Sequence, residues 1–263
     1  CIIDAINAEA WDGDWYVRGF DDDGHAIGAS ACKEGFIYLN VQSWAMICGA
    51  ADKTRQKKIF AAIDKKLKTP LGYQLMASAY KTFDPVIGRV TAMEPGICEN
   101  ATIYSHGNSW MVLALLRMNE TERGWQLYQD ATPAFGDSEL KRRNPRFVYG
   151  NCFFGPEHRN SPYMMEFNWI TGSISWFYNN LLDELLGIRR EYTGLKIAPH
   201  IPAAWNGFKM QRLFRGKTIN VTVKGHGSQV ASVTLNGVKQ AGDFVAESDL
   251  KPENTLDVVM ENR

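Results

Sequence analysis

Two polar segments of the sequence stand directly before stretches with the composition of buried helices. One runs from Glu99 to His106 and precedes the apolar residues 108–118, and the other ends at Thr171-Gly172, where a helical pattern over residues 171–186 begins. The first backbone N–H groups of a helix are unpaired and lie at the positive end of its dipole, so they favour an anion. An imidazole, a hydroxyl and a glycine N–H at two such places would suit an oxyanion or a phosphate. Taken singly, each segment is also typical of ordinary helix capping, which is the commoner role.

Aromatic residues and carboxylates are mixed in an earlier segment. Residues 11–16 read WDGDWY, and three aspartates follow at positions 21–23. Aromatic rings can stack on sugar rings while carboxylates accept hydrogens from sugar hydroxyls, so this segment could contact a carbohydrate. A surface turn with a structural tryptophan explains the same residues equally well.

The histidines do not form a metal-binding pattern. Glu157 and His158 are adjacent, but no second histidine lies at ligand spacing and no His-Glu-x-x-His motif occurs. His25, His200 and His226 stand in turn or strand contexts and are expected to be structural or exposed to solvent. The sequence therefore predicts no metal site and no cofactor.

Composition limits the classes of protein to which the chain can belong. Its 263 residues carry 29 Lys and Arg against 29 Asp and Glu, and 45% are hydrophobic. Such a chain can bury a full core, and zero net charge removes the electrostatic case for a nucleic-acid or membrane-surface partner. The 5 cysteines form no Cys-x-x-Cys pair, so buried thiols in a reducing cytoplasm are the simplest interpretation. No apolar run approaches the roughly 18 residues of a membrane span, and no signal peptide is visible.

Helices are expected to dominate the first two-thirds of the chain. Helical patterns cover residues 45–51, 59–67, 108–118, 121–129 and 171–186. Between them lie two long segments rich in Gly and Pro, residues 79–100 and 133–168, which we expect to be functional loops.

The pattern changes after about residue 190. Alternation with period two predicts strands at residues 194–201, 208–214, 217–223, 230–235 and 256–260. Asn236-Gly237 predicts a hairpin turn. The sequence therefore predicts a mainly α fold, with a helical domain over residues 1–190 and a small antiparallel β domain over residues 191–263.

Taken together and in order, the motifs of this chain resemble the cellobiose and chitobiose phosphorylase family, glycoside hydrolase family ninety-four. They are WDGDWYVRGFDDDG, SACKEGFIYLNVQSWA, PGICENATIYSHGNSW and NWITGSISW. The segment GLKIAPHIPAAWNGFKMQRLFRG is also similar to that family's entry into its C-terminal β region. The resemblance extends to about residue 240 and implies the C-terminal half of an (α/α)6 barrel followed by a β-sandwich-like domain.

The resemblance also implies a reaction. Members of the family cleave a β-linked disaccharide with inorganic phosphate and release an α-sugar 1-phosphate with inversion. Because phosphate takes the place that water holds in an inverting hydrolase, the site needs hydrogen-bond donors and not a carboxylate base. The resemblance assigns phosphate binding to His106, Thr171, Gly172 and Asn151, and contact with the sugar near the scissile bond to Glu99.

One part of the family's machinery is not found in this sequence. The general acid is an Asp in a Trp-Asn-Asp motif that precedes the WDGxW segment, and Trp-Asn-Asp does not occur here. No catalytic residue is therefore assigned, and the chain, which begins with Cys1 and not Met, is expected to be the C-terminal part of a longer enzyme and inactive alone. Arg89 lies in a stretch that contacts the acceptor sugar in the family, and this Arg suggests an altered acceptor pocket, for a neutral sugar or an aldonic acid.

These expectations describe a cytoplasmic hexosyltransferase of carbohydrate metabolism with phosphate as co-substrate. Its partners would be a β-linked disaccharide, phosphate and the rest of the parent polypeptide, and a homodimer is expected because members of the family commonly dimerise. Two alternatives stay open. A carbohydrate-binding or scaffold fragment would lack catalysis even in its parent, and a hydrolase of similar barrel shape would place a carboxylate base near the attacking water.

Overall fold

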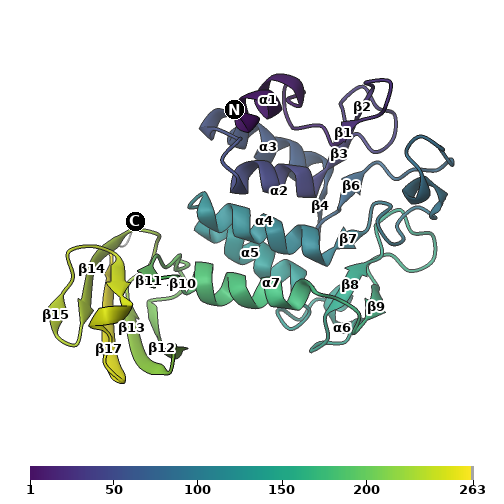
Figure 1. Ribbon diagram of the computed structural model, residues 1–263. Helices are drawn as coiled ribbons and strands as arrows, with labels where there is room; N and C mark the ends of the chain where they lie inside the picture. Colours follow the sequence, from purple (N-terminus) through teal and green to yellow (C-terminus); the bar gives the residue numbers. More distant parts are fainter. Residues whose placement is uncertain (262–263) are drawn as a thin grey trace. The chain divides into compact units, whose positions relative to one another are not determined.

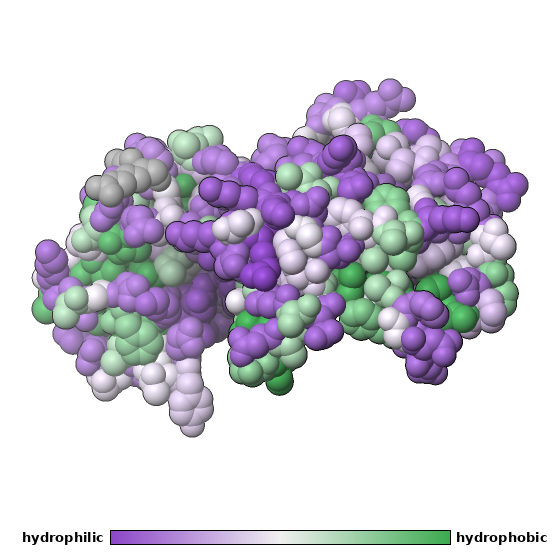
Figure 2. Space-filling model, turned by 90° about the horizontal axis from the view of Figure 1, so that it is seen from above, coloured by the Kyte–Doolittle hydropathy of each residue, from purple (hydrophilic) through white to green (hydrophobic). Residues whose placement is uncertain are grey.

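The computed structural model describes residues 1–261 of the chain (Figure 1). The chain divides into two compact units: a helical unit of residues 1–114 and 126–176, and a β unit of residues 115–125 together with the residues from 177 onward. On the face shown in Figure 2, hydrophilic residues cover most of the surface and hydrophobic residues form small separate patches. None of the helices within residues 1–261 is long and apolar enough to cross a lipid bilayer.

Seven α-helices lie within residues 1–261, several of them close to the predicted positions. They are α1 (Ile2–Glu9), α2 (Leu39–Ile47), α3 (Lys53–Lys66), α4 (Ser105–Arg117), α5 (Thr121–Ala131), α6 (Glu139–Arg142) and α7 (Ser173–Asn179). The helix predicted over residues 45–51 begins earlier, at Leu39, and ends before Gly49, whose φ of 79° stops it. The helix predicted over residues 171–186 is α7 continued by a π-helix, η2 (Asn180–Leu185).

Three of these helices, α2, α4 and α7, lie side by side, and a tryptophan from each contacts the others. The ring centroids of Trp44 and Trp110 are 5.6 Å apart, and those of Trp110 and Trp176 are 6.0 Å apart. Each helix follows a short strand in the sequence, namely β3 (Ile37–Tyr38), β7 (Ile103–Tyr104) and β9 (Met165–Asn168). Figure 1 shows the first turns of the three helices at the same end of this layer. The polar segments singled out in the sequence therefore come together there.

Short antiparallel sheets connect the helices. β1 (Gly19–Phe20) pairs with β2 (Ala26–Ile27), β3 with β6 (Met76–Ala77), and β4 (Lys68–Thr69) with β5 (Gly72–Tyr73). Residues 79–100 form a long connection that contains the 3-10 helix η1 (Arg89–Ala92).

The prediction of a loop over residues 133–168 is wrong, because this segment contains two strands and a short helix. β8 (Gly150–Phe153) pairs with β7 on one side and with β9 on the other. Both strands are only four residues long, and their burial does not alternate from residue to residue. Their partner β7 lies far away in the sequence, so no local pattern signals the pairing.

The β unit contains two sheets. Three strands form one of them, in the order β10 (Ile188–Glu191), β11 (Gly194–Ile197) and β16 (Phe244–Ala246). Five strands form the other, in the order β12 (Gly207–Phe214), β13 (Lys217–Lys224), β17 (Glu253–Met260), β14 (Val230–Leu235) and β15 (Val238–Lys239). The 3-10 helix η3 (Glu247–Asp249) follows β16. Alternate side chains of β17 are buried, so one face of the larger sheet packs into the core. Asn236 and Gly237 join β14 to β15 with φ values of 51° and 81°, which confirms the predicted two-residue turn.

The β domain is not wholly antiparallel, which corrects the prediction. β17 lies between β13 and β14, antiparallel to β14 and parallel to β13. Since β13 and β14 run in opposite directions, any strand inserted between them must be parallel to one of the two. A helix-rich part followed by a β part is confirmed, whereas the C-terminal half of an (α/α)6 barrel and the division at residue 190 stay predictions.

Candidate functional site

His106 lies in the first turn of α4 and is half-buried. The Ser105 hydroxyl donates to the carbonyl of Gly150 at 2.8 Å, which ties the start of α4 to β8. The Asn108 amide accepts from the N–H of Tyr73 and donates to its carbonyl, both at 2.8 Å, which ties it to β5. Burial lowers the pKa of His106, and no neighbouring charge contributes to the shift. The imidazole is therefore neutral near pH 7, with one N–H to donate.

The Thr171-Gly172 segment lies directly against the His106 ring. A Cβ placed on Gly172 would lie 3.4 Å from Nε2 of His106. The Thr171 hydroxyl accepts a hydrogen bond from the N–H of Ser173 at 3.1 Å and donates to the Ser173 hydroxyl at 2.8 Å. Thr171 thus caps α7, and this cap places the backbone of Gly172 beside the imidazole. In the described part of the chain, the Gly172 N–H has no hydrogen-bond acceptor.

The side chain of Tyr104 connects Asn151 with His106. Its amide nitrogen donates to the Tyr104 hydroxyl at 3.2 Å, and the Tyr104 ring centroid lies 6.0 Å from that of His106. Burial is the main cause that raises the pKa of Tyr104, so this phenol stays protonated at neutral pH. Of the four residues to which the resemblance assigns phosphate, Gly172 lies beside His106, Thr171 precedes Gly172 in the chain, and Asn151 is bonded to Tyr104.

Glu99 and Arg89 lie on the long connection between β6 and β7, and both side chains are exposed. The carboxylate of Glu99 lies close enough to Tyr104 to contribute to its raised pKa. The positive charge of Arg89 acts to lower the pKa of the Cys98 thiol, which directly precedes Glu99 in the chain. Among the described residues the Arg89 guanidinium has neither an ion-pair partner nor a hydrogen bond.

A buried carboxylate that the sequence did not single out as a site residue lies in the same region. Glu166 accepts a hydrogen bond from the Cys98 N–H at 3.0 Å and from the Cys152 thiol at 3.2 Å. Burial and this carboxylate raise the pKa of Cys98 to about 11 and also raise that of Cys152, so both thiols are protonated at neutral pH. The signal for this cluster lies only in the pairing of β8 with β9, which sets Cys152 opposite Glu166.

Tryptophans form an aromatic base below the histidine. Trp110 follows His106 by one helical turn, and their ring centroids are 5.7 Å apart. Trp176 follows Gly172 by the same four residues, and its ring meets that of Trp110. This repeated spacing is the sequence signal that could have identified the aromatic base in advance.

The other candidate segments have structural roles. The buried Trp15 indole donates to the carbonyls of Gly28 and Phe36, both at 3.0 Å. The His158 ring stacks on Phe154 with centroids 4.2 Å apart, and Glu157 accepts from the Ala79 N–H at 3.1 Å. Nowhere in residues 1–261 do three or more His, Cys, Asp or Glu side chains gather as a metal ion would require.

Comparison with known proteins identifies the family of the chain. The model of the glycosyl hydrolase 94 superfamily, catalytic domain, matches residues 1–187, and that of the glycosyl hydrolase family 65, C-terminal domain, matches residues 188–238. The chain therefore belongs to the glycosyl hydrolase 94 superfamily, as its motifs suggested.

Several of its relatives among curated proteins are disaccharide phosphorylases. The chain is 32% identical over 92% of its length to a solabiose phosphorylase of Paenibacillus borealis, and covers 32% of that protein. It is 32% identical over 97% of its length to a cellobionic acid phosphorylase of Neurospora crassa, and covers 33% of that protein. It is 32% identical over 92% of its length to an N,N'-diacetylchitobiose phosphorylase of Vibrio proteolyticus, and covers 31% of it. The chain thus spans about a third of the length of these relatives.

Proposed function

We propose that this chain forms the phosphate-binding part of an inverting disaccharide phosphorylase. The contact between His106 and the Thr171-Gly172 segment carries the proposal, because it joins a neutral N–H donor to the first turns of two neighbouring helices. Helix N-termini and unpaired backbone N–H groups favour an anion. The disaccharide phosphorylases among the relatives support phosphate as that anion.

The electrostatics near His106 favour phosphate over hydrolysis. An inverting hydrolase needs a carboxylate base beside its water, and a carboxylate close to His106 would raise the pKa of the imidazole. Burial alone acts on His106, and it lowers that pKa. An imidazole on which no carboxylate acts suits a nucleophile that is already anionic.

The chemistry follows from these positions. His106 and the Gly172 N–H would donate to phosphate oxygens, and the Thr171 hydroxyl would lie at the same anion. A phosphate oxygen forms the new bond to the anomeric carbon as the glycosidic bond breaks on the opposite face, which inverts the configuration. A carboxylic acid must give its proton to the leaving oxygen. Because the Trp-Asn-Asp motif is missing here, we assign that acid to a part of the longer protein outside these residues.

Glu99, Asn151 and Arg89 complete the proposed site. The exposed Glu99 carboxylate would accept a hydrogen from a sugar hydroxyl near the scissile bond. Asn151 would support the phosphate pocket through its hydrogen bond to Tyr104. Arg89 would meet the acceptor.

Activity with and without phosphate tests the main proposal. In the longer protein that contains this chain, release of sugar 1-phosphate should require phosphate, and His106→Ala should lower turnover about a hundredfold, the usual cost of one lost donor. His226→Ala, in the β unit, serves as the matched control and should retain activity. Sugar release without phosphate would favour a hydrolase, and full phosphorolysis by His106→Ala would contradict the site.

Arg89 also favours an anionic acceptor, since its exposed guanidinium has no ion-pair partner among the described residues. In the synthetic direction, Arg89→Gln should raise KM for an aldonic acid and leave KM for a neutral sugar unchanged. Arg143→Gln, another exposed Arg, is the matched control. Equal effects of Arg89→Gln on both acceptors would contradict this assignment.

A further inference from the structure

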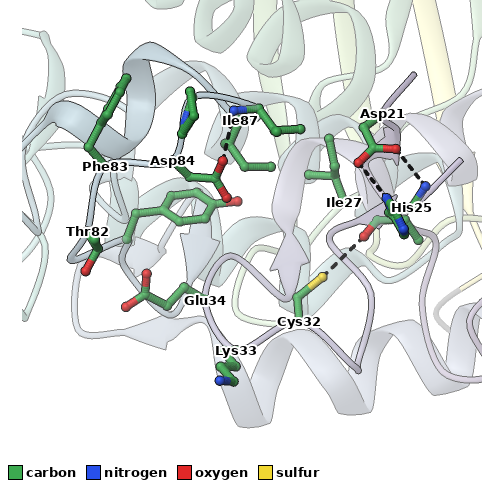
Figure 3. Close-up of a pocket in the computed structure, with 14 residues that line it drawn as sticks. Asp21, His25, Ile27, Cys32, Lys33, Glu34, Thr82, Phe83, Asp84 and Ile87 are labelled. Atoms are coloured by element: carbon green, nitrogen blue, oxygen red, sulfur yellow. Dashed lines mark hydrogen bonds and ion pairs between the residues drawn. The ribbon is translucent and has the colours of Figure 1, made fainter. Parts of the chain in front are cut away.

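A cavity of about 650 Å³ lies in the helical unit and shares none of its lining residues with the candidate phosphate site. It is formed by two segments, residues 21–34 and residues 80–87. Figure 3 shows Thr82, Phe83 and Asp84 on one side of the view and Asp21, His25 and Ile27 on the other. Its volume is within the range of small-molecule sites, about 300–1,000 Å³.

The base of this cavity is rigid. The hydroxyls of Tyr80 and Tyr38 form a buried hydrogen bond of 2.8 Å. The backbone of Gly35 passes so close to Tyr80 that a Cβ there would lie 2.2 Å from the phenolic oxygen. The Gly35 N–H also donates to the carbonyl of Ser78 at 2.8 Å, which holds the two segments together. These contacts hold the base of the cavity in place.

Three carboxylates line the cavity, and backbone N–H groups fix each of them. Asp21 accepts from the His25 N–H at 2.7 Å, and Glu34 accepts from the Lys81 N–H at 3.2 Å. Asp84 accepts from the Val86 N–H at 2.9 Å. A carboxylate has about four acceptor positions, so each keeps capacity for a ligand hydroxyl.

Apolar side chains lie among these acceptors and are exposed to solvent. Phe83 is 59% exposed and Val86 is 65% exposed, although both line the cavity. An exposed aromatic ring beside fixed hydrogen-bond acceptors suits a sugar, whose ring presents an apolar face and whose edge presents hydroxyls. Lys33 is the one permanently cationic residue of the lining, so the excess of carboxylates disfavours an anion. A metal ion is an unsuitable ligand, because no metal-binding group of three such side chains occurs within residues 1–261.

We propose that this cavity, lined by Phe83, Glu34, Asp84 and Asp21, binds a neutral saccharide at a site separate from the phosphate site. Phe83 stacks on the sugar ring, and the three carboxylates accept hydrogens from its hydroxyls. The site does not depend on phosphate and takes no part in bond cleavage. It would hold a sugar chain on the protein next to the segment that carries Arg89.

Calorimetric titration of this chain with cellotetraose tests the proposal. We expect saturable binding that phosphate does not alter, and a loss in affinity of about fivefold or more in Phe83→Ala, the cost of one aromatic contact. Phe147→Ala is the matched control, since Phe147 is 85% exposed and lies outside the cavity. This control should bind like the unaltered chain, and cellobionate, which carries a negative charge, should bind more weakly than cellobiose.

The same titration separates this proposal from the phosphate site. His106→Ala should leave the binding of cellotetraose unchanged, even if it abolishes phosphorolysis in the longer protein. Binding lost in His106→Ala but retained in Phe83→Ala would place the sugar at the phosphate site and overturn the inference. Absence of binding, or equal affinity in Phe83→Ala and Phe147→Ala, would overturn it as well.

Discussion

His106 and His200 are both histidines whose pKa burial lowers, yet their surroundings differ. His200 is almost fully buried, with Nδ1 3.0 Å from the Glu184 carbonyl and Nε2 3.3 Å from the Asn119 side chain. His106 has aromatic neighbours and the Gly172 backbone beside Nε2. Burial with two protein partners gives His200 a structural role, whereas the His106 ring has no hydrogen-bond partner among the described residues.

His200 should make stability depend on pH. Its folded pKa lies below the ordinary value of about 6.5, so the unfolded chain binds more protons as pH falls below that value. The free energy of unfolding should therefore decrease between about pH 7 and about pH 5, and the decrease should be smaller in His200→Gln. Urea denaturation at several pH values measures both. An equal decrease in the two proteins would contradict the assignment.

The residues of the site were only partly predictable from the sequence. His106 and Thr171-Gly172 could be found because each stands before a helix, where elementary electrostatics favours an anion. Glu166 could not be found from the sequence, because its role comes from a strand pairing that places it opposite Cys152. The carboxylates of the cavity lie in segments that the sequence singled out for other reasons, and their grouping depends on a contact between distant segments, so the sequence does not predict the cavity.

At the scale of elements, the proposed phosphate site depends on the first turn of α7, which lies beside His106 of α4. Gly172→Ala should weaken phosphate binding, because the added methyl would lie 3.4 Å from Nε2 of His106 and occupy the space beside the donor. Gly107→Ala adds the same methyl to α4 at 3.4 Å from Leu75 and 3.5 Å from Leu39, in an apolar contact. It should retain phosphate binding and be as stable as the unaltered chain or more, since Ala favours a helix by about 1 kcal/mol over Gly.

Phosphate titration of the two variants, with the free energy of unfolding measured alongside, makes this comparison. Equal loss of phosphate binding in Gly107→Ala would mean that the methyl acts through the packing of α4. Unchanged binding in Gly172→Ala would remove the Gly172 backbone from the site.

The turn between β14 and β15 gives a second prediction at this scale. Gly237 has a φ of 81° in open space, so Gly237→Ala adds backbone strain without a steric clash. The free energy of unfolding of the β unit should fall by about 1 kcal/mol. Chemical denaturation followed by circular dichroism would detect this, and Gly242→Ala, also in open space but without a positive φ, should change stability less.

Elements with a strong local pattern were predicted, and elements defined by distant partners were not. The apolar run of α4 and the Asn236-Gly237 turn were clear from their own residues. The insertion of β17 between β13 and β14 was not clear from the sequence. Alternation of apolar and polar residues reveals which face of a strand is buried, but it does not reveal the neighbouring strand or its direction.

At the scale of the whole molecule, the chain combines a helix-rich part that holds the candidate sites with a β part that holds its own core. It covers about a third of the length of its curated relatives, and it lacks the Trp-Asn-Asp motif to which the family resemblance assigns the general acid. We therefore expect the chain alone to bind phosphate without cleaving a disaccharide. Release of sugar 1-phosphate by the isolated chain would show that it contains a general acid that we have not assigned.

The central claim is that His106 binds inorganic phosphate together with the Thr171-Gly172 segment. Histidine ring resonances in a phosphate titration of the isotopically labelled chain test it most directly, because the chain has 5 histidines and the other four act as internal references. We predict a saturable shift of the His106 ring signals that is absent for His200 and is lost in Gly172→Ala. Unchanged His106 signals at saturating phosphate, or equal shifts for all five histidines, would contradict the claim.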